Sequence, residues 1–186
     1  MGLILASRSP QRRAILERLG VAFEVVGVDV EEIADGHATE VARENALSKA
    51  RAGSLARPGE TVLGVDTVVA LDGEIFGKPA TAEDAAATLK RLSGRTHEVV
   101  SGLALLAPDN PQVVHEVTMV QFRDLPDELI RRYVKTGEWS GRAGGYAIQE
   151  QGGALVRSIS GDYLNVVGLP VGKLLDLDLS LILRQR

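Results

Sequence analysis

The segment 61–71, with the sequence TVLGVDTVVAL, is almost entirely apolar and constrains the fold more than any other part of the chain. An apolar run of this length is typical of a strand that is buried on both faces. Strand and helix signals alternate along the rest of the chain, and this alternation predicts an α/β architecture. The chain is therefore expected to fold as an α/β protein with this strand in its interior.

Hydrophobic periodicity and turn signals divide the chain into short elements. Strands are expected at 2–6, 23–26, 61–71, 74–76, 96–106, 113–122 and 154–159, and helices at 10–19, 40–52, 81–92, 126–135 and after 168–170. Asp72 and Gly73 predict a tight hairpin turn. Because no repeat, linker or low-complexity segment is visible, residues 1–186 are expected to form one domain with two lobes.

Composition excludes several classes of function. The net charge is −4, with 21 basic and 25 acidic residues, whereas a non-specific nucleic-acid binder normally has a basic surplus. The absence of cysteine removes disulfides, thiol catalysis and cysteine-based metal sites. No apolar run approaches the roughly 20 residues of a membrane helix, so a cytoplasmic protein without nucleic-acid or membrane partners is expected.

The first predicted strand runs directly into a basic helix start. Ser9 can cap that helix, and Pro10 suits its first position because the missing N–H costs nothing there. Arg8, Arg12 and Arg13 lie within the same few residues. Free backbone amides, the positive end of a helix dipole and guanidinium groups together favour phosphate binding. The alternative is a capped helix with solvated arginines.

Asp66 interrupts the apolar strand and is the strongest candidate for chemistry. A buried carboxylate costs several kcal/mol unless a charge partner, a metal or a catalytic task retains it. Next to a bound phosphate its natural role is that of a general base or a metal ligand. The alternative is a carboxylate that caps a neighbouring loop.

Four other features add candidate residues, and one of them, the acidic loop, is informative only if phosphate is bound nearby. Lys78 lies between Gly77 and Pro79, which direct its side chain, and Lys49 lies on the helix at 40–52, where surface ion pairing is the alternative. The amide of Gln149 can bond to the edge of a base. An acidic loop at 27–36 offers oxygen ligands for Mg²⁺ or Mn²⁺ through Asp29, Glu31 and Glu32, although such loops are usually just solvated.

Taken together, these motifs resemble the Maf family of nucleoside triphosphate pyrophosphatases, which has the inosine-triphosphatase-like fold. The resemblance covers nearly the whole chain and rests on LASRSPQR at 5–12, ENALSKA at 44–50, GVDTVV at 64–69, GKP at 77–79, LSGRTH at 92–97, GYAIQ at 145–149 and GDYLNVVGLP at 161–170. It implies a mixed, twisted sheet flanked by helices, with two lobes around a central cleft. It also implies a homodimer.

The resemblance further implies hydrolysis of a nucleoside triphosphate between its α and β phosphates, with a divalent cation (Mg²⁺ or Mn²⁺), as house-cleaning of the nucleotide pool. Asp66 would accept the proton and, with Glu32, hold the metal. The triphosphate would be held by Ser7, Ser9, Arg12, Arg13, Lys49 and Lys78. Base specificity would fall on Gln11, Thr67 and Gln149.

The segment 145–149 is closer to the family's dTTP/UTP branch than to its 7-methyl-GTP branch, which implies dTTP, UTP or modified pyrimidine nucleotides as substrates. The family usually has two arginines after Ser-Pro, and Gln11 stands in the first of these positions. Either Arg13 compensates from the neighbouring position, or the site contacts the base differently. A nucleotide-binding regulator of septum formation without turnover is the alternative function.

Overall fold

The computed structural model describes residues 2–183 and contains one seven-stranded mixed sheet. Its strands are β1 (Leu3–Leu5), β2 (Phe23–Val25), β3 (Thr61–Leu71), β4 (Glu74–Phe76), β5 (Thr96–Ala107), β6 (Asn110–Phe122) and β7 (Val156–Ser160). Its helices are α1 (Pro10–Arg18), α2 (Ala38–Ala56), α3 (Ala82–Leu92), α4 (Asp127–Val134), α5 (Tyr163–Val167), α6 (Val171–Leu177) and α7 (Ser180–Leu183). None of the helices within this range has the length and apolarity that a membrane crossing requires.

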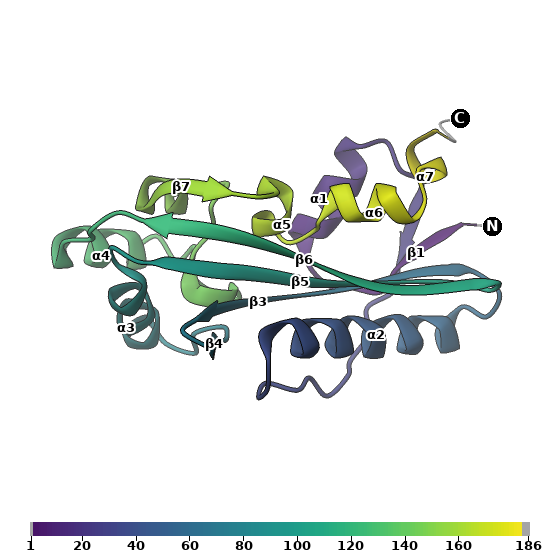
Figure 1. Ribbon diagram of the computed structural model, residues 1–186, viewed down its shortest axis with the longest axis horizontal. Coiled ribbons are helices and arrows are strands. Elements are labelled where there is room, and N and C mark those ends of the chain that lie inside the picture. Colours follow the sequence, from purple (N-terminus) through teal and green to yellow (C-terminus); the bar gives the residue numbers. More distant parts are fainter. Residues whose placement is uncertain (1, 184–186) are drawn as a thin grey trace.

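The strand order is β2-β1-β3-β5-β6-β7, and β4 pairs with the far end of β3. The strands β2, β1 and β3 run parallel, whereas β3, β5, β6 and β7 are antiparallel. Figure 1 shows β3, β5 and β6 spanning the length of the molecule, with α1, α5 and α6 on one face and α2 on the other. The expected mixed α/β fold is therefore confirmed.

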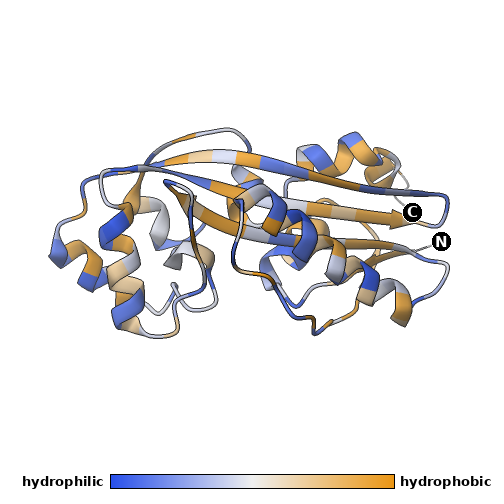
Figure 2. Cartoon of the chain, turned by 60° about the horizontal axis from the view of Figure 1, so that its bottom comes forward, coloured by the Kyte–Doolittle hydropathy of each residue, from blue (hydrophilic) through white to orange (hydrophobic). Residues whose placement is uncertain are grey.

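The helix α2 lies unusually close to the sheet because two glycines face it. A Cβ added at Gly64 would lie 2.2 Å from the carbonyl oxygen of Ala46, and one added at Gly102 would lie 2.1 Å from that of Ala42. The buried face of α2 is consequently rich in alanine. Figure 2 shows the strands mostly in hydrophobic colours, while the helices alternate between hydrophobic and hydrophilic segments. This packing fixes the height of α2 above β3.

The opposite end of the sheet has its own core beneath α3 and α4. There His97, Phe122 and Tyr146 pack edge to face, with ring centroids 4.8–5.5 Å apart. The same core includes Leu89 and Leu92 of α3 and Ile130 and Tyr133 of α4. The long strands thus connect two clusters of helices that lie at different ends of one sheet.

One edge of β3 remains uncovered in its middle. β1 pairs with β3 only over Thr61–Leu63, and β4 pairs with it only over Val69–Leu71. Within residues 2–183, no strand pairs with this edge of β3 between those two stretches. The gap contains Asp66 and Thr67, so the residues expected to carry chemistry lie where the sheet is open.

Most expected elements agree with the structure to within a few residues. Asp72 and Gly73 both have positive φ, 53° and 82°, as a two-residue type I′ hairpin turn requires. The turn between β5 and β6 is shorter than expected, since both strands extend to leave only Pro108 and Asp109 between them. The late strand begins at Val156 because residues 151–155 form a short 3₁₀ segment, and the helix α5 was not expected.

Candidate active site

A cleft of about 490 Å³ lies at the open edge of β3. Its walls come from the β1–α1 connection, the acidic loop, α2, β3 and the segment 140–149. It is lined by all of the predicted site residues except Arg13 and Glu31: Ser7, Ser9, Gln11, Arg12, Asp29, Glu32, Lys49, Asp66, Thr67, Lys78 and Gln149. Residues far apart in the sequence therefore meet in one place.

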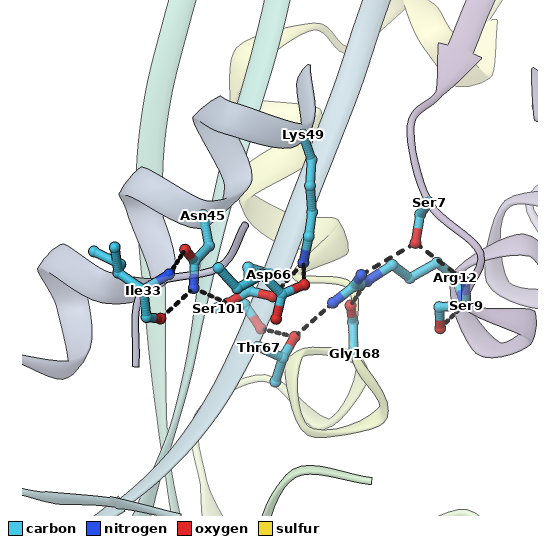
Figure 3. Close-up of polar contacts among 11 residues, drawn as sticks. Ser7, Ser9, Arg12, Ile33, Asn45, Lys49, Asp66, Thr67, Ser101 and Gly168 are labelled. Atoms are coloured by element: carbon cyan, nitrogen blue, oxygen red, sulfur yellow. Dashed lines mark hydrogen bonds and ion pairs between the residues drawn. The ribbon is translucent and has the colours of Figure 1, made fainter. Parts of the chain in front are cut away.

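Arg12 is held in the cleft by three side-chain hydrogen bonds. Its Nε donates to the carbonyl oxygen of Gly168 (2.8 Å), its Nη1 to Oγ of Ser7 (3.1 Å) and its Nη2 to Oγ1 of Thr67 (3.2 Å). Figure 3 shows the guanidinium stretched between these partners. Burial lowers the pKa of Arg12, and the negative charges of Asp66 and Glu32 oppose that shift. The side chain is thus a fixed positive charge on the α1 wall.

The start of α1 follows the predicted capping pattern. Ser9 is the N-cap, its hydroxyl accepts a long hydrogen bond (3.5 Å) from the backbone N–H of Arg12, and Pro10 occupies the first helical position. Ser9 also donates to Oε1 of Gln11 at 3.1 Å, while the Ser9 backbone N–H donates to Oγ of Ser7. A compact set of hydroxyl and amide groups therefore surrounds the positive end of the helix.

Asp66 is buried on the opposite face of the sheet, against α2. Its Oδ1 accepts a hydrogen bond of 2.5 Å from Nζ of Lys49, and its Oδ2 accepts one of 3.2 Å from Nδ2 of Asn45. Lys49 also pairs with Glu32 at 2.7 Å. The carboxylates of Asp66 and Glu32 therefore share one ammonium group. The alternative for Lys49, an ion pair on the exposed surface of its own helix, is thus wrong.

Asn45 is a further member of this site that the sequence motifs do not point to. Its side chain is 3% exposed, and its Oδ1 and Nδ2 bond to the backbone N–H and carbonyl of Ile33, both at 2.9 Å. Asn45 thereby ties the acidic loop, which carries Glu32, to the helix above Asp66 (Figure 3). Its spacing of four residues from Lys49 was the available signal, because such a pair shares one helix face.

Arg13 does not reach the cleft. Its side chain is 64% exposed, and its Nε donates to Oε1 of Glu17, one turn along α1, at 2.7 Å. Successive helix residues point in directions about 100° apart, so Arg12 and Arg13 cannot both face the same wall. The structure thus offers no support for compensation of Gln11 by Arg13.

The segment 140–149 forms the far wall of the cleft, opposite α1. Tyr146 is packed into the core, where its hydroxyl shares a hydrogen bond of 2.9 Å with Nε2 of His97. Burial lowers the pKa of His97 to about 4 and raises the pKa of Tyr146. Arg142 also lines the cleft and was not predicted. These buried contacts hold the segment that presents Gln149.

The donor chemistry of the cleft fits a divalent cation in part. Asp66 and Glu32 provide carboxylate oxygens, the ligand type that Mg²⁺ and Mn²⁺ prefer. Within residues 2–183, however, no group of three or more histidine, cysteine or acidic side chains is arranged to hold a metal ion. A cation held here would therefore need further oxygen ligands from a bound phosphate or from water.

Comparison with known proteins agrees with the geometry. The family described as "Maf-like protein" matches residues 2–178. The chain belongs to the Maf family. Among its relatives is a dTTP/UTP pyrophosphatase of Symbiobacterium thermophilum, 50% identical over 172 residues, which cover 91% of this chain and 88% of the relative.

Two further relatives of this Maf protein have the same name. The dTTP/UTP pyrophosphatase of Nitratidesulfovibrio vulgaris is 49% identical, with 92% of this chain and 84% of the relative covered. That of Pyrococcus furiosus is 44% identical, with 91% and 90% covered. The resemblance noted in the sequence is therefore confirmed at the level of family and fold.

Proposed function

We propose that this Maf-family protein is a nucleoside triphosphate pyrophosphatase that hydrolyses dTTP and UTP to the monophosphate and pyrophosphate. The observation that carries the proposal is a buried carboxylate, Asp66, in a cleft whose other walls present Arg12, Lys49 and Lys78. The names of relatives at 44–50% identity support the same reaction. Modified pyrimidine nucleotides have the same base edge and belong to the same proposal.

In the proposed reaction, Asp66 orients a water molecule and accepts its proton as the oxygen attacks the α-phosphorus. The new P–O bond forms while the bond from the α-phosphorus to the bridging oxygen breaks, and pyrophosphate leaves with that electron pair. The cations around the cleft stabilise the charge that develops on the phosphate oxygens. Since Asp66 is only 6% exposed, little bulk water competes for its carboxylate.

The triphosphate is proposed to lie between the α1 wall and the far wall of the cleft. Ser7, Ser9 and Arg12 hold it from one side and Lys78 from the other, while Lys49 lies between them on α2. A divalent cation held by Glu32 and Asp66 together with phosphate oxygens would supply further neutralisation of the triphosphate charge. Arg12 is preordered by its three hydrogen bonds, so little side-chain entropy is lost when phosphate binds.

Base selection is proposed to rest on Gln11 and Gln149, whose amides can both donate to and accept from a pyrimidine edge. Thr67 remains a third proposed specificity residue, and its contacts give it a second role. Its hydroxyl accepts from Arg12 and shares a 2.8 Å hydrogen bond with Ser101, so it fixes Arg12 in place. We therefore propose that Thr67 also positions Arg12.

The experiment that tests this function is pyrophosphate release from dTTP, UTP, CTP, GTP, ATP and 7-methyl-GTP, with Mg²⁺ and with Mn²⁺. Turnover confined to dTTP, UTP and related pyrimidines is the expected result. Turnover spread over purines would overturn the base preference and implicate Gln11 in altered specificity. Tight binding without any turnover would instead favour the nucleotide-binding regulator.

The remaining expectations concern domain organisation, assembly, location and partners. One sheet continues from β2 to β7, which supports a single domain over residues 2–183. The homodimer stays a prediction from the family, the location in the cytoplasm one from the lack of a membrane-length apolar run, and the absence of nucleic-acid partners one from the net charge of −4. Sedimentation of the purified protein and a low-salt binding assay with single-stranded DNA test the first and last of these.

A further inference from the structure

We infer that Lys49 is the resident counter-cation of the Glu32–Asp66 carboxylate pair and must leave that position before a divalent metal can bind there. In this account Lys49 sets the metal affinity of the nucleotide-free protein and couples metal binding to nucleotide binding. The part that concerns nucleotide rests on the function proposed above. The part that concerns metal alone does not.

The geometry places a single positive charge where a shared metal would lie. Nζ of Lys49 is 2.5 Å from Oδ1 of Asp66 and 2.7 Å from Oε1 of Glu32. The side chains of Lys49 and Asp66 are about nine-tenths buried, at 11% and 8% exposure, whereas that of Glu32 is 41% exposed. Two carboxylates from different segments converge on one ammonium, and one of these ion pairs is shielded from water.

The ammonium and a divalent ion compete for the same oxygens. Asp66 and Glu32 are the residues that would help to hold a divalent cation, and Oδ1 of Asp66 and Oε1 of Glu32 now accept from Lys49. The other oxygen of Asp66, Oδ2, already accepts a hydrogen bond from Asn45. A metal arriving alone must therefore break two buried or half-buried charge-assisted hydrogen bonds and place its own charge next to an ammonium.

A triphosphate changes this balance because it offers Lys49 new anionic partners in the same cleft. Once Lys49 turns to phosphate oxygens, the carboxylate oxygens are released for the metal, and the phosphate supplies the further ligands that residues 2–183 do not bring together. Metal and nucleotide consequently help each other to bind, and the coupling is the same in both directions. Asn45 stays in place throughout, since its neutral amide does not compete with a cation.

The test is a titration of the nucleotide-free protein with Mn²⁺ alone, with free Mn²⁺ measured by electron paramagnetic resonance. Lys49→Met removes the competing ammonium and should lower the Mn²⁺ dissociation constant by about tenfold or more, the scale of one lost charged hydrogen bond. Lys49→Arg keeps the charge and should resemble wild type. Lys90→Met is the matched control, since Lys90 is an exposed lysine paired with Asp127 at 3.4 Å.

Equal or weaker Mn²⁺ binding by a folded Lys49→Met protein, with folding checked by circular dichroism, would overturn the inference. A second measurement does not depend on that single comparison. The non-hydrolysable α,β-imido analogue of dUTP should tighten Mn²⁺ binding to wild type, and more strongly than to Lys49→Gln. Equal coupling in both proteins would also overturn it, whereas failure of the analogue to bind at all would count against the proposed function and leave the Mn²⁺ titration decisive.

Discussion

Asp66 and Thr67 are neighbours in β3, yet their side chains lie on opposite faces of the sheet and both line the same cleft. Asp66 contacts Asn45 and Lys49 on α2, whereas Thr67 contacts Arg12 on α1. This is possible because the edge of β3 is open between β1 and β4, so the cleft extends around that edge. The cleft is thus lined by Asp66 and Lys49 from the α2 side of the sheet and by Arg12 from the α1 side.

Replacement of the proposed proton acceptor is the first prediction. Asp66→Asn keeps the shape and the hydrogen bond with Asn45 but cannot accept a proton, so kcat should fall by about 10²–10⁴-fold, the usual contribution of a general base. Nucleotide affinity, measured by calorimetry without a divalent cation, should stay within a few-fold. An equal loss of affinity and rate would shift Asp66 from proton transfer to a structural or metal-holding role.

The two adjacent arginines of α1 should behave differently. Arg12→Lys loses the planar fork that reaches Gly168, Ser7 and Thr67, and KM for dTTP should rise by about tenfold or more. Arg13→Ala removes only an exposed pair with Glu17 and should leave KM nearly unchanged. Steady-state kinetics of both variants decide the matter, and a larger effect of Arg13→Ala would contradict the placement of the two side chains.

The close approach of α2 to the sheet should be needed for activity as well as for stability. Gly102→Ala places a methyl group 2.1 Å from the carbonyl oxygen of Ala42, which should cost about 1–3 kcal/mol in unfolding free energy. Because α2 carries Asn45 and Lys49, kcat should fall too. Gly172→Ala is the control, since its added carbon meets nothing nearer than 3.9 Å. Its unfolding free energy in urea and its kcat should both equal those of wild type.

Burial of His97 predicts a specific dependence of stability on pH. Its folded pKa is lowered from 6.5 to about 4, so between these values the unfolded chain binds a proton that the folded chain does not. The unfolding free energy should therefore fall by about 1.4 kcal/mol per pH unit, or roughly 3 kcal/mol in all, as pH drops through this window. Above pH 6.5 this group should have no effect.

Urea unfolding at pH 7, 6, 5 and 4.5 measures that slope. The variant His97→Phe has no imidazole to titrate at this position. Its unfolding free energy should therefore fall less between pH 6 and 4.5 than that of wild type, although other groups lower the unfolding free energy of both proteins. Identical slopes for the two proteins would rule out His97 as the source.

Features that depend only on residues close in the chain could be predicted from the sequence. The apolar run with Asp66 inside it, the Ser9 cap and the Asp72–Gly73 turn all depend on residues close in the chain, and the structure has each of them. The five-residue helix α5 was missed because so short a segment has no apolar periodicity. Its end matters for the site, since Gly168 accepts a hydrogen bond from Arg12.

The contacts that depend on tertiary structure could not be predicted in this way. Whether Arg12 or Arg13 faces the cleft depends on how α1 is rotated against the sheet, which neither residue reveals alone. The role of Asn45 depends on the acidic loop folding back over α2, which brings Ile33 of the loop into hydrogen-bond contact with Asn45, 12 positions away. The open edge of β3 could not be predicted either. It exists because β1 and β4 both pair with the same edge of β3 and are each too short to cover its middle.

The measurement that tests the central claim most directly is hydrolysis of dTTP in ¹⁸O-labelled water, with the products resolved by ³¹P nuclear magnetic resonance. Attack at the α-phosphorus by a water held at Asp66 predicts dTMP and pyrophosphate, with the label in dTMP alone. Label in the pyrophosphate, or products that are dTDP and inorganic phosphate, would contradict the account.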